Sequence, residues 1–195
     1  MNKTNLELKH FCSDFSRVRE VLKGLGAKKE IIKKQTDYFF NIPNQKAKFK
    51  LRIEGKKKLL VYYERPDFLK AKSAVSKVKL YDVKDSKLLD FLNAVLGVKA
   101  VVKKRREVWR RANTVFHIDN VIGVGDIFEI ELQKKGKITS LDKKQFRIYQ
   151  DKLLPYLDRI IKGSNVDLVP ARSKWLGSNS HGCSPQSVIY LCIYG

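Results

Sequence analysis

The hydrophobic pattern of the chain changes repeatedly between a two-residue period and a helical period. In NLELKHF, Leu6 and Leu8 alternate with polar residues, which is typical of a β-strand. Residues 13–26 instead place their apolar side chains on one helical stripe and finish at Gly26, a residue suited to ending a helix. The chain is therefore predicted to begin with a strand and a helix.

The same signals continue to the end of the patterned region. Alternation predicts further strands at residues 36–42, 48–55, 59–67, 76–83, 100–111, 113–121 and 126–132. Helical spacing predicts a second helix at 85–97 and a third at about 140–162, with Pro155 as a break or kink. The order strand, helix and three strands appears twice, which indicates a duplicated architecture.

The polar faces of these strands carry charges of both signs. Their charged positions are Glu7, Lys9, Lys50, Arg52, Lys104, Arg106, Glu129 and Glu131. In a closed antiparallel barrel, one face of every strand points into a shared lumen, and the apolar faces can pack under helices outside. The fold predicted is therefore α+β, an antiparallel barrel with helices packed on its outside. Such a lumen would suit a polyanion bound with divalent metal ions.

Charge and composition narrow the class of partner. The 195 residues include 41 Lys or Arg and 20 Asp or Glu, giving a net charge of +21. This excess favours nucleic acid, an anionic membrane or a small polyphosphate as partner. No apolar run approaches the roughly 20 residues that span a bilayer, and no signal peptide is evident. Cys12, Cys183 and Cys192 form neither a zinc spacing nor a disulfide framework, so a cytoplasmic protein is expected.

Single motifs in this chain carry little weight. The EIE of residues 129–131, taken alone, is typical of a solvated strand face, and the basic segments could likewise be exposed strands. His10, His117 and His181 are scattered and predict no metal site. Only the joint order of the motifs points to a specific function.

That order resembles the CYTH superfamily of triphosphate tunnel metalloenzymes, which includes class IV adenylyl cyclases, thiamine triphosphatases and inorganic triphosphatases. The similarity is strongest to the CyaB-type branch and covers residues 4–169. It is carried by NLELK, KLR at 50–52, YYERPD at 62–67, KKRREVW at 103–109, HIDNVIGVGDIFEIEL at 117–132 and GSNVDL at 163–168.

The resemblance implies an eight-stranded antiparallel tunnel and a set of site residues. It implies Mg²⁺ or Mn²⁺ bound by Glu7, Asp119, Glu129 and Glu131, and triphosphate bound by Lys9, Lys50, Arg52, Lys104 and Arg106. Glu7, Lys9 and Glu131 would take part in catalysis. The implied substrates are ATP, tripolyphosphate or thiamine triphosphate.

Two positions depart from the family pattern. The family signature Glu-x-Glu-x-Lys begins here with Asn5, which offers a carbonyl oxygen but no negative charge. Glu64 stands where many members carry a phosphate-binding Lys, a charge that Lys77 or Lys79 could supply instead.

The sequence leaves the reaction open. A cyclase, in which the ribose 3′-hydroxyl of ATP attacks the α-phosphate, and a triphosphate hydrolase would use the same tunnel. A non-catalytic basic β-domain that binds RNA or polyphosphate is the rival from a different class, although neither nucleic acid nor a membrane is the expected partner, and a homodimer is left open. Residues 1–170 are expected to form the CYTH domain, and residues 171–195 a tail outside it.

Overall fold

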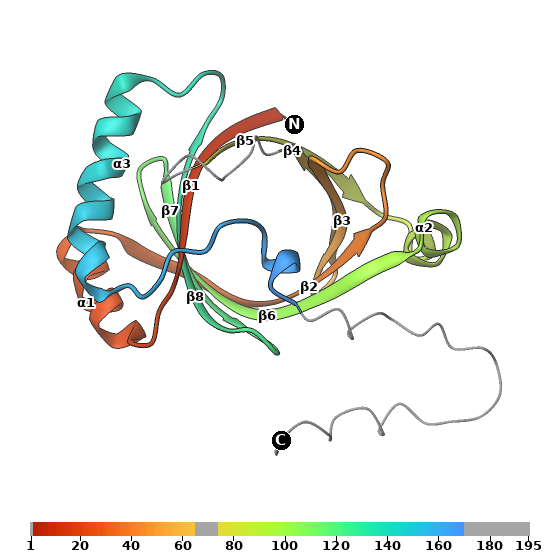
Figure 1. Cartoon of the computed structure of the whole chain (residues 1–195), viewed down its shortest axis with the longest axis horizontal. Helices are drawn as coiled ribbons and strands as arrows, with labels where there is room; N and C mark the ends of the chain where they lie inside the picture. The colour runs from red at the N-terminus through yellow and green to blue at the C-terminus, as the bar shows by residue number, and fades with distance from the viewer. Residues whose placement is uncertain (1, 65–73, 170–195) are drawn as a thin grey trace, which may run out of the picture.

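In the computed structural model, which describes residues 2–64 and 74–169, the strands close into one antiparallel barrel (Figure 1). The elements are β1 (Asn2–Phe11), α1 (Phe15–Gly24), β2 (Lys28–Phe40), β3 (Ala47–Glu54), β4 (Lys57–Glu64), β5 (Ala74–Val83), α2 (Leu88–Leu96), β6 (Val98–Arg111), β7 (Thr114–Val121), β8 (Gly125–Lys134), α3 (Ser140–Leu153), η2 (Leu154–Tyr156) and η3 (Asn165–Asp167). The predicted α+β fold, an eight-stranded antiparallel barrel with helices outside, is confirmed.

The two halves of the chain meet through equivalent strands. Around the barrel the order is β1-β5-β4-β3-β2-β6-β7-β8. The first strand of each half pairs with the other, β1 with β5, and so do the second strands, β2 with β6. The repeated order of one strand, one helix and three strands, predicted from the sequence, is present in the structure.

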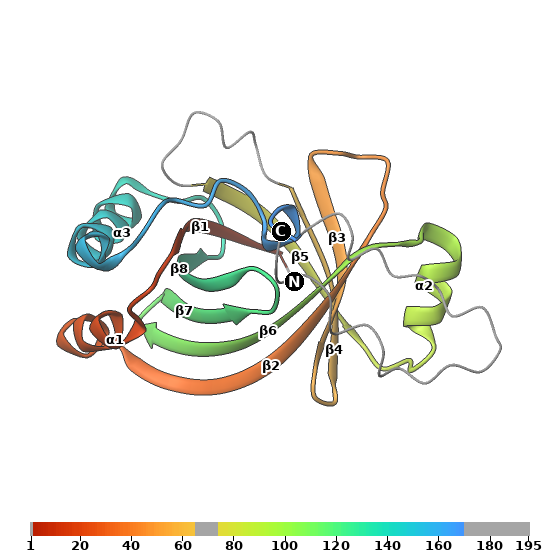
Figure 2. The same ribbon diagram turned by 60° about the horizontal axis from the view of Figure 1, so that its bottom comes forward.

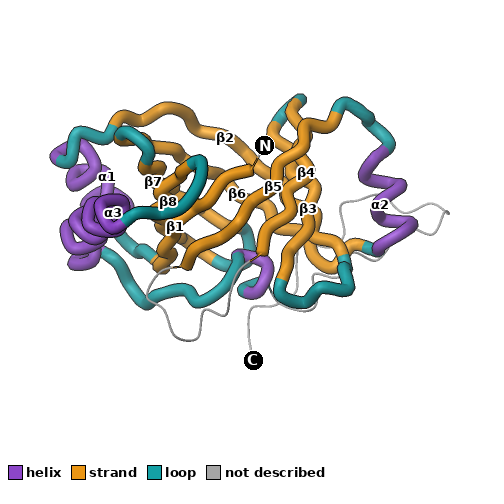
Figure 3. Tube along the Cα trace, turned by 90° about the horizontal axis from the view of Figure 1, so that it is seen from above, coloured by secondary structure: helices purple, strands orange, loops and turns teal. Residues whose placement is uncertain are grey.

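Helices cover the outer apolar faces of the strands at two separate places. Helices α1 and α3 lie together against one side of the barrel, and α2 lies at the far end of the molecule (Figures 2 and 3). Beneath α1 and α3, Leu22 and Leu153 pack with Phe116 and Phe128 in one core cluster. A second cluster contains Leu92 of α2 together with residues of β2 and β3. With their apolar faces outside, these strands turn their polar faces inward.

The third helix is shorter than its sequence pattern predicts. Helix α3 ends at Leu153 and a single 3-10 turn, η2, contains Pro155, so the break predicted at Pro155 is confirmed and the predicted continuation of the helix to residue 162 is wrong. Proline has no backbone N–H and its ring clashes with the preceding turn, which stops the helix here instead of bending it. The chain then runs beside β1, where the Ile161 N–H donates to the carbonyl of Lys9 at 2.9 Å.

This returning segment closes one end of the lumen. Phe39, Val102 and Ile127 point inward there and pack with Ile161 and Val166 in an apolar cluster. In Figure 1, η3 lies across the barrel opening. Next to it, the hydroxyls of Ser164 and Tyr63 are hydrogen-bonded at 2.7 Å. The polar part of the lumen therefore ends against an apolar plug.

Two further predictions concern the C-terminal tail and membrane-spanning segments. The tail predicted at residues 171–195 lies outside the described residues, so its separation from the domain stays a prediction. None of the helices in residues 2–64 and 74–169 has the length and apolar character needed to cross a bilayer.

Candidate active site

The lumen holds a cavity of about 350 Å³ lined mainly by charged and polar side chains. Strand pairing fixes which of them meet. Between β1 and β8, Glu7 is the partner of Glu131 and Lys9 is the partner of Glu129. The Lys9 ammonium lies 3.4 Å from the Glu129 carboxylate and 3.9 Å from that of Glu7. Because side chains alternate across a strand, a shift of one residue in this register would turn all of them outward.

One pair of cations is held by Asp37 of β2. Its carboxylate accepts a hydrogen bond from Lys50 Nζ at 2.6 Å, and from Arg52 Nε and Nη2 at 2.7 and 2.8 Å. Asp37 and Arg52 are direct cross-strand partners between β2 and β3. Such a two-point contact fixes the plane of the guanidinium as well as its position.

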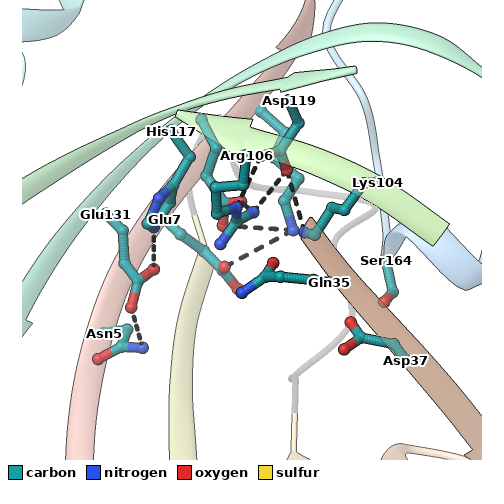
Figure 4. A network of polar contacts seen from close by, with 12 residues as sticks. Asn5, Glu7, Gln35, Asp37, Lys104, Arg106, His117, Asp119, Glu131 and Ser164 are labelled. Atoms are coloured by element: carbon teal, nitrogen blue, oxygen red, sulfur yellow. Dashed lines mark hydrogen bonds and ion pairs between the residues drawn. The ribbon is translucent and has the colours of Figure 1, made fainter. Parts of the chain in front are cut away.

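A second pair of cations is held in the same way by Asp119 of β7 (Figure 4). Asp119 accepts from Lys104 Nζ at 3.0 Å and from Arg106 Nε and Nη2 at 2.6 Å each. It is fully buried, at 0% exposure, and is the cross-strand partner of Arg106. Arg106 also reaches Glu129 at 3.1 Å. Each Lys-x-Arg pair of the lumen thus has an aspartate directly opposite its arginine.

Burial shifts the pKa values of these groups strongly. Loss of solvation, helped by the charge of Arg52, lowers the pKa of Lys50 to about 7 even though Asp37 opposes the shift. Loss of solvation and the charge of Arg106 lower the pKa of Lys104 to about 8. Burial acts against ionisation of Asp37, but Arg52 and Lys50 outweigh it and hold the pKa of Asp37 well below its usual range. Both lysines therefore titrate near neutral pH.

Glu131 is the centre of a separate group of polar side chains. It accepts hydrogen bonds from Asn5 Nδ2 at 2.6 Å and from Gln133 Nε2 at 3.0 Å, and it lies 3.0 Å from His117 Nε2 (Figure 4). Burial opposes its ionisation, but the bond with His117 leads the effects that lower its pKa to about 2. Burial, with the charge of Arg106, lowers the pKa of His117 and so favours the neutral imidazole.

Within the described part of the chain, two buried acceptor atoms without a partner lie on side chains that contact Glu131. With Nε2–H donating to the carboxylate, Nδ1 of His117 is an acceptor. Neither this atom nor the carbonyl oxygen of Asn5 has a hydrogen-bond partner among the described residues. Buried polar atoms are rarely left unpaired in proteins, so each such atom calls for an explanation.

The chemistry of these side chains fits a hard divalent cation at one part of the lumen. The carboxylates of Glu7, Glu129 and Glu131 and the unpaired carbonyl oxygen of Asn5 are oxygen donors of the kind that Mg²⁺ and Mn²⁺ prefer. They are not arranged as a ready metal cluster: within residues 2–64 and 74–169 no group of three or more His, Cys, Asp or Glu has that geometry. Asp119 fits less well, because both of its oxygens already accept from the positive charges of Lys104 and Arg106, whereas Glu131 accepts from the neutral amides of Asn5 and Gln133.

The structure brings most of the predicted site residues into one lumen. Those that line the cavity are Glu7, Lys9, Arg52, Lys104, Arg106, Glu129 and Glu131. Lys50 and Asp119 lie buried beside them, bound to Asp37 and to the second cation pair. Their assigned roles in metal binding, substrate binding and catalysis stay predictions.

Lys79 is not part of this group. On β5 the cavity is lined by Ser76, Val78 and Leu80, whereas Lys77 and Lys79 are exposed on the opposite face. The prediction that one of these lysines supplies the charge missing at Glu64 is therefore corrected. Alternation along the strand is the reason, since neighbours at odd and even positions cannot share a face.

Three residues of the lumen were not predicted from the sequence to belong to the site. Asp37 and Gln35 share a face of β2, and the spacing of two residues was the only signal that could have found them. His117 lies on the same face of β7 as Asp119, but it was missed because a single histidine does not form a recognisable cluster in the sequence.

Comparisons with known proteins agree with this fold. The model of the CYTH domain matches residues 3–155, and the chain belongs to this family. A comparison with curated proteins finds no match.

Solved structures extend the likeness across most of the chain. The PH1012 protein from Pyrococcus horikoshii OT3 is 25% identical with a TM-score of 0.69, covering 85% of this chain and 99% of its own. A proposed adenylate cyclase from Vibrio parahaemolyticus is 15% identical, with a TM-score of 0.66 and coverage of 84% and 96%. The proposed adenylyl cyclase HpAC1 from Hippeastrum, described as having a dominant triphosphatase activity, is 15% identical, with a TM-score of 0.57 and coverage of 91% and 100%.

Asp37→Asn should destabilise the protein, because Lys50 and Arg52 would keep their burial and lose their counter-charge. The expected loss in free energy of unfolding is roughly 3 kcal/mol, measured by urea denaturation. The matched control is Asp82→Asn, since Asp82 pairs with Lys57 in an exposed ion pair at 3.9 Å; its effect should stay within about 0.5 kcal/mol. Equal effects of the two variants would contradict the anchoring role of Asp37.

The lowered pKa of Lys50 predicts a pH dependence of stability. The pKa of Lys50 is about 7 in the folded chain against its ordinary value of 10.5, so between these values the folded chain binds fewer protons than the unfolded chain. The contribution of Lys50 to stability therefore rises with pH across this window, with a limiting slope of about 1.4 kcal/mol per pH unit. Denaturation at pH 7, 8 and 9 should show a steeper rise for the wild type than for Lys50→Met. Parallel curves would mean that Lys50 stays fully charged.

Proposed function

We propose that this protein is a divalent-metal-dependent enzyme that cleaves a triphosphate bound inside the barrel. The observation that carries the proposal is the meeting of two Lys-x-Arg pairs, from β3 and β6, with the carboxylates of β1 and β8 in one lumen. Lysine and arginine bind phosphate oxygens, and carboxylates bind the hard cations that accompany phosphates. Membership of the CYTH family supports the same conclusion.

Each group of side chains has a distinct task in this proposal. Arg52 and Arg106, each oriented by an aspartate, present fixed guanidinium groups to phosphate oxygens. Glu7, Glu129 and Glu131, with the carbonyl of Asn5, would hold Mg²⁺ or Mn²⁺. A cation there supplies charge stabilisation to phosphate oxygens as the bond breaks. Lys9 lies between the carboxylates of Glu7 and Glu129 and would also contact a phosphate oxygen.

The reaction we favour is hydrolysis of the triphosphate. The Hippeastrum protein with a dominant triphosphatase activity shares the fold along the full length of its chain. Cyclisation of ATP to cyclic AMP and pyrophosphate is the second candidate, and the Vibrio structure proposed as an adenylate cyclase favours it.

Product analysis separates these functions. The protein is incubated with ATP, tripolyphosphate or thiamine triphosphate, with Mg²⁺ or Mn²⁺, and the products are separated by ion-exchange chromatography. Hydrolysis releases orthophosphate, whereas cyclisation releases cyclic AMP and pyrophosphate. A protein that binds these compounds without releasing any product would instead be a non-catalytic polyphosphate-binding domain, and the proposal would fail.

The charge balance of the lumen predicts that substrate and metal bind together. Each of its buried cations already lies close to a carboxylate, that of Asp37, Asp119 or Glu129, so a triphosphate anion alone would bring uncompensated charge into a buried site. Calorimetry should therefore find tripolyphosphate binding at least about 100-fold tighter with saturating Mn²⁺ than with EDTA, a coupling of roughly 2.7 kcal/mol. By reciprocity, tripolyphosphate should tighten Mn²⁺ binding by the same factor. Equal affinity in EDTA would contradict the proposed metal requirement.

Asn5→Glu tests the metal position without measuring activity. The new carboxylate would face Glu131, whose Oε1 lies 2.6 Å from Asn5 Nδ2. Like charges at this distance repel when no cation separates them, so the variant should have a lower melting temperature in EDTA. It should gain more from Mn²⁺ than the wild type does, and at a lower Mn²⁺ concentration.

Asn120→Glu is the matched control for that variant. Asn120 also donates to a carboxylate, that of Asp126 at 2.6 Å, but on the exposed side of the barrel. Its melting temperature should rise with Mn²⁺ only as much as that of the wild type, because the proposed metal ligands are unchanged. Identical Mn²⁺ responses in the two variants would place position 5 outside the metal site.

A further inference from the structure

One wall of the cavity differs in chemistry from the rest. The residues that β4 and β5 contribute to the lining are Lys57, Leu59, Val61, Tyr63, Ser76, Val78 and Leu80. Apart from Lys57, which is exposed at the start of β4, these lining residues are uncharged. Leu59, Val78 and Leu80 are only partly buried, so they present apolar surface to the cavity.

The direction of the alternation on β5 makes this wall unusual. Lys77, Lys79 and Tyr81 are exposed outside, while Val78 and Leu80 point inward. The register is set by pairing of Leu80 with Val61 and of Ser76 with Asn5. A lumen that bound only phosphate would be served better by the two lysines, and the opposite parity would place them inside. The outward lysines therefore leave an apolar inner face that a phosphate alone does not use.

The apolar wall lies across the lumen from the cations of β6. In a closed barrel of eight strands, strands four places apart in the order are opposite each other, so β5 faces β6 and β4 faces β7. Strand β6 carries Lys104 and Arg106. The cavity of about 350 Å³ also lies in the range of about 300–1,000 Å³ that is usual for small-molecule sites. Its ligand should therefore have an anionic part and an apolar part.

We infer that the substrate is an organic triphosphate, the ester of a nucleoside or of another heterocyclic alcohol, and not inorganic tripolyphosphate. Its phosphates lie along the β3 and β6 cations, and its organic part packs on Leu59, Val78 and Leu80. This inference rests on the proposed function and adds the substrate class to it. Packing an organic group here removes apolar surface from water. Phosphate oxygens against the same wall would lose solvation without gaining a hydrogen bond.

The test is a comparison of dissociation constants for two ligands that are not cleaved. Bis-methylene analogues of ATP and of tripolyphosphate are titrated calorimetrically into the full-length protein with saturating Mn²⁺. The ATP analogue should bind at least about 10-fold tighter than the inorganic analogue. Leu80→Ser should weaken the ATP analogue by about 10-fold, because apolar contact is lost, and should leave the inorganic analogue nearly unchanged.

Two further variants make the result specific to the wall. Lys79→Ser, one residue away on the outer face, should change neither affinity. Leu80→Lys should shift the preference toward the inorganic analogue, and melting curves check that each variant is folded. The inference is overturned if both analogues bind equally well to the wild type, or if Leu80→Ser weakens both alike. If neither analogue binds to the wild type, the proposed triphosphate function itself fails, and the inference falls with it.

Discussion

The pairing of buried charges is the constraint on which the rest of this structure depends. The inner cations are Lys9, Lys50, Arg52, Lys104 and Arg106, and the inner carboxylates are Glu7, Asp37, Asp119, Glu129 and Glu131. Removing a charge from water costs several kcal/mol, which only a well-placed opposite charge can offset. The strands accordingly alternate in sign where they adjoin: cations on β3 and β6, aspartates on β2 and β7. A slipped register would separate these pairs, so the ionic network and the hydrogen-bonded barrel specify each other.

The same balance changes how the net charge of +21 is understood. The inside of the barrel is close to neutral, since each of its cations lies near a carboxylate. The excess positive charge lies elsewhere and can attract a polyanion over a distance. It is not what holds a ligand in the lumen. Under the proposed function, binding there would depend on orientation, because Asp37 and Asp119 hold the arginines in place, and on a metal ion that would bring its own positive charge. We regard the aspartates as residues that position the arginines, and we propose the β1 and β8 carboxylates as the metal ligands.

Short-range patterns predicted much of this arrangement. A two-residue period identified every strand, and its parity placed Glu7, Arg52 and Glu131 on inner faces, because alternation is a local property of extended chain. The start of β2 was missed: it begins at Lys28 instead of residue 36, since residues 28–35 have no clear alternation and are held by pairing along β6.

The parts that depend on contacts between distant residues could not be predicted. The ion pair between Lys50 and Asp37 depends on the register of β2 and β3, and no local motif in the sequence specifies that register. The bond between His117 and Glu131 likewise joins two strands, and a lone histidine gives no signal. Lys79 was placed by analogy with a charge that relatives carry, and the parity of its own strand, visible in the sequence, argued against it.

The central claim is that the charges inside the barrel bind a metal–triphosphate complex. A crystal structure with Mn²⁺ and the bis-methylene tripolyphosphate analogue tests it most directly, because the anomalous signal of manganese locates the metal independently of the ligand. Manganese should lie beside Glu129 and Glu131, and phosphate oxygens should lie on Arg52 and Arg106 while Asp37 and Asp119 still hold these arginines. Manganese or phosphate bound only on the outer lysines of the barrel would contradict it.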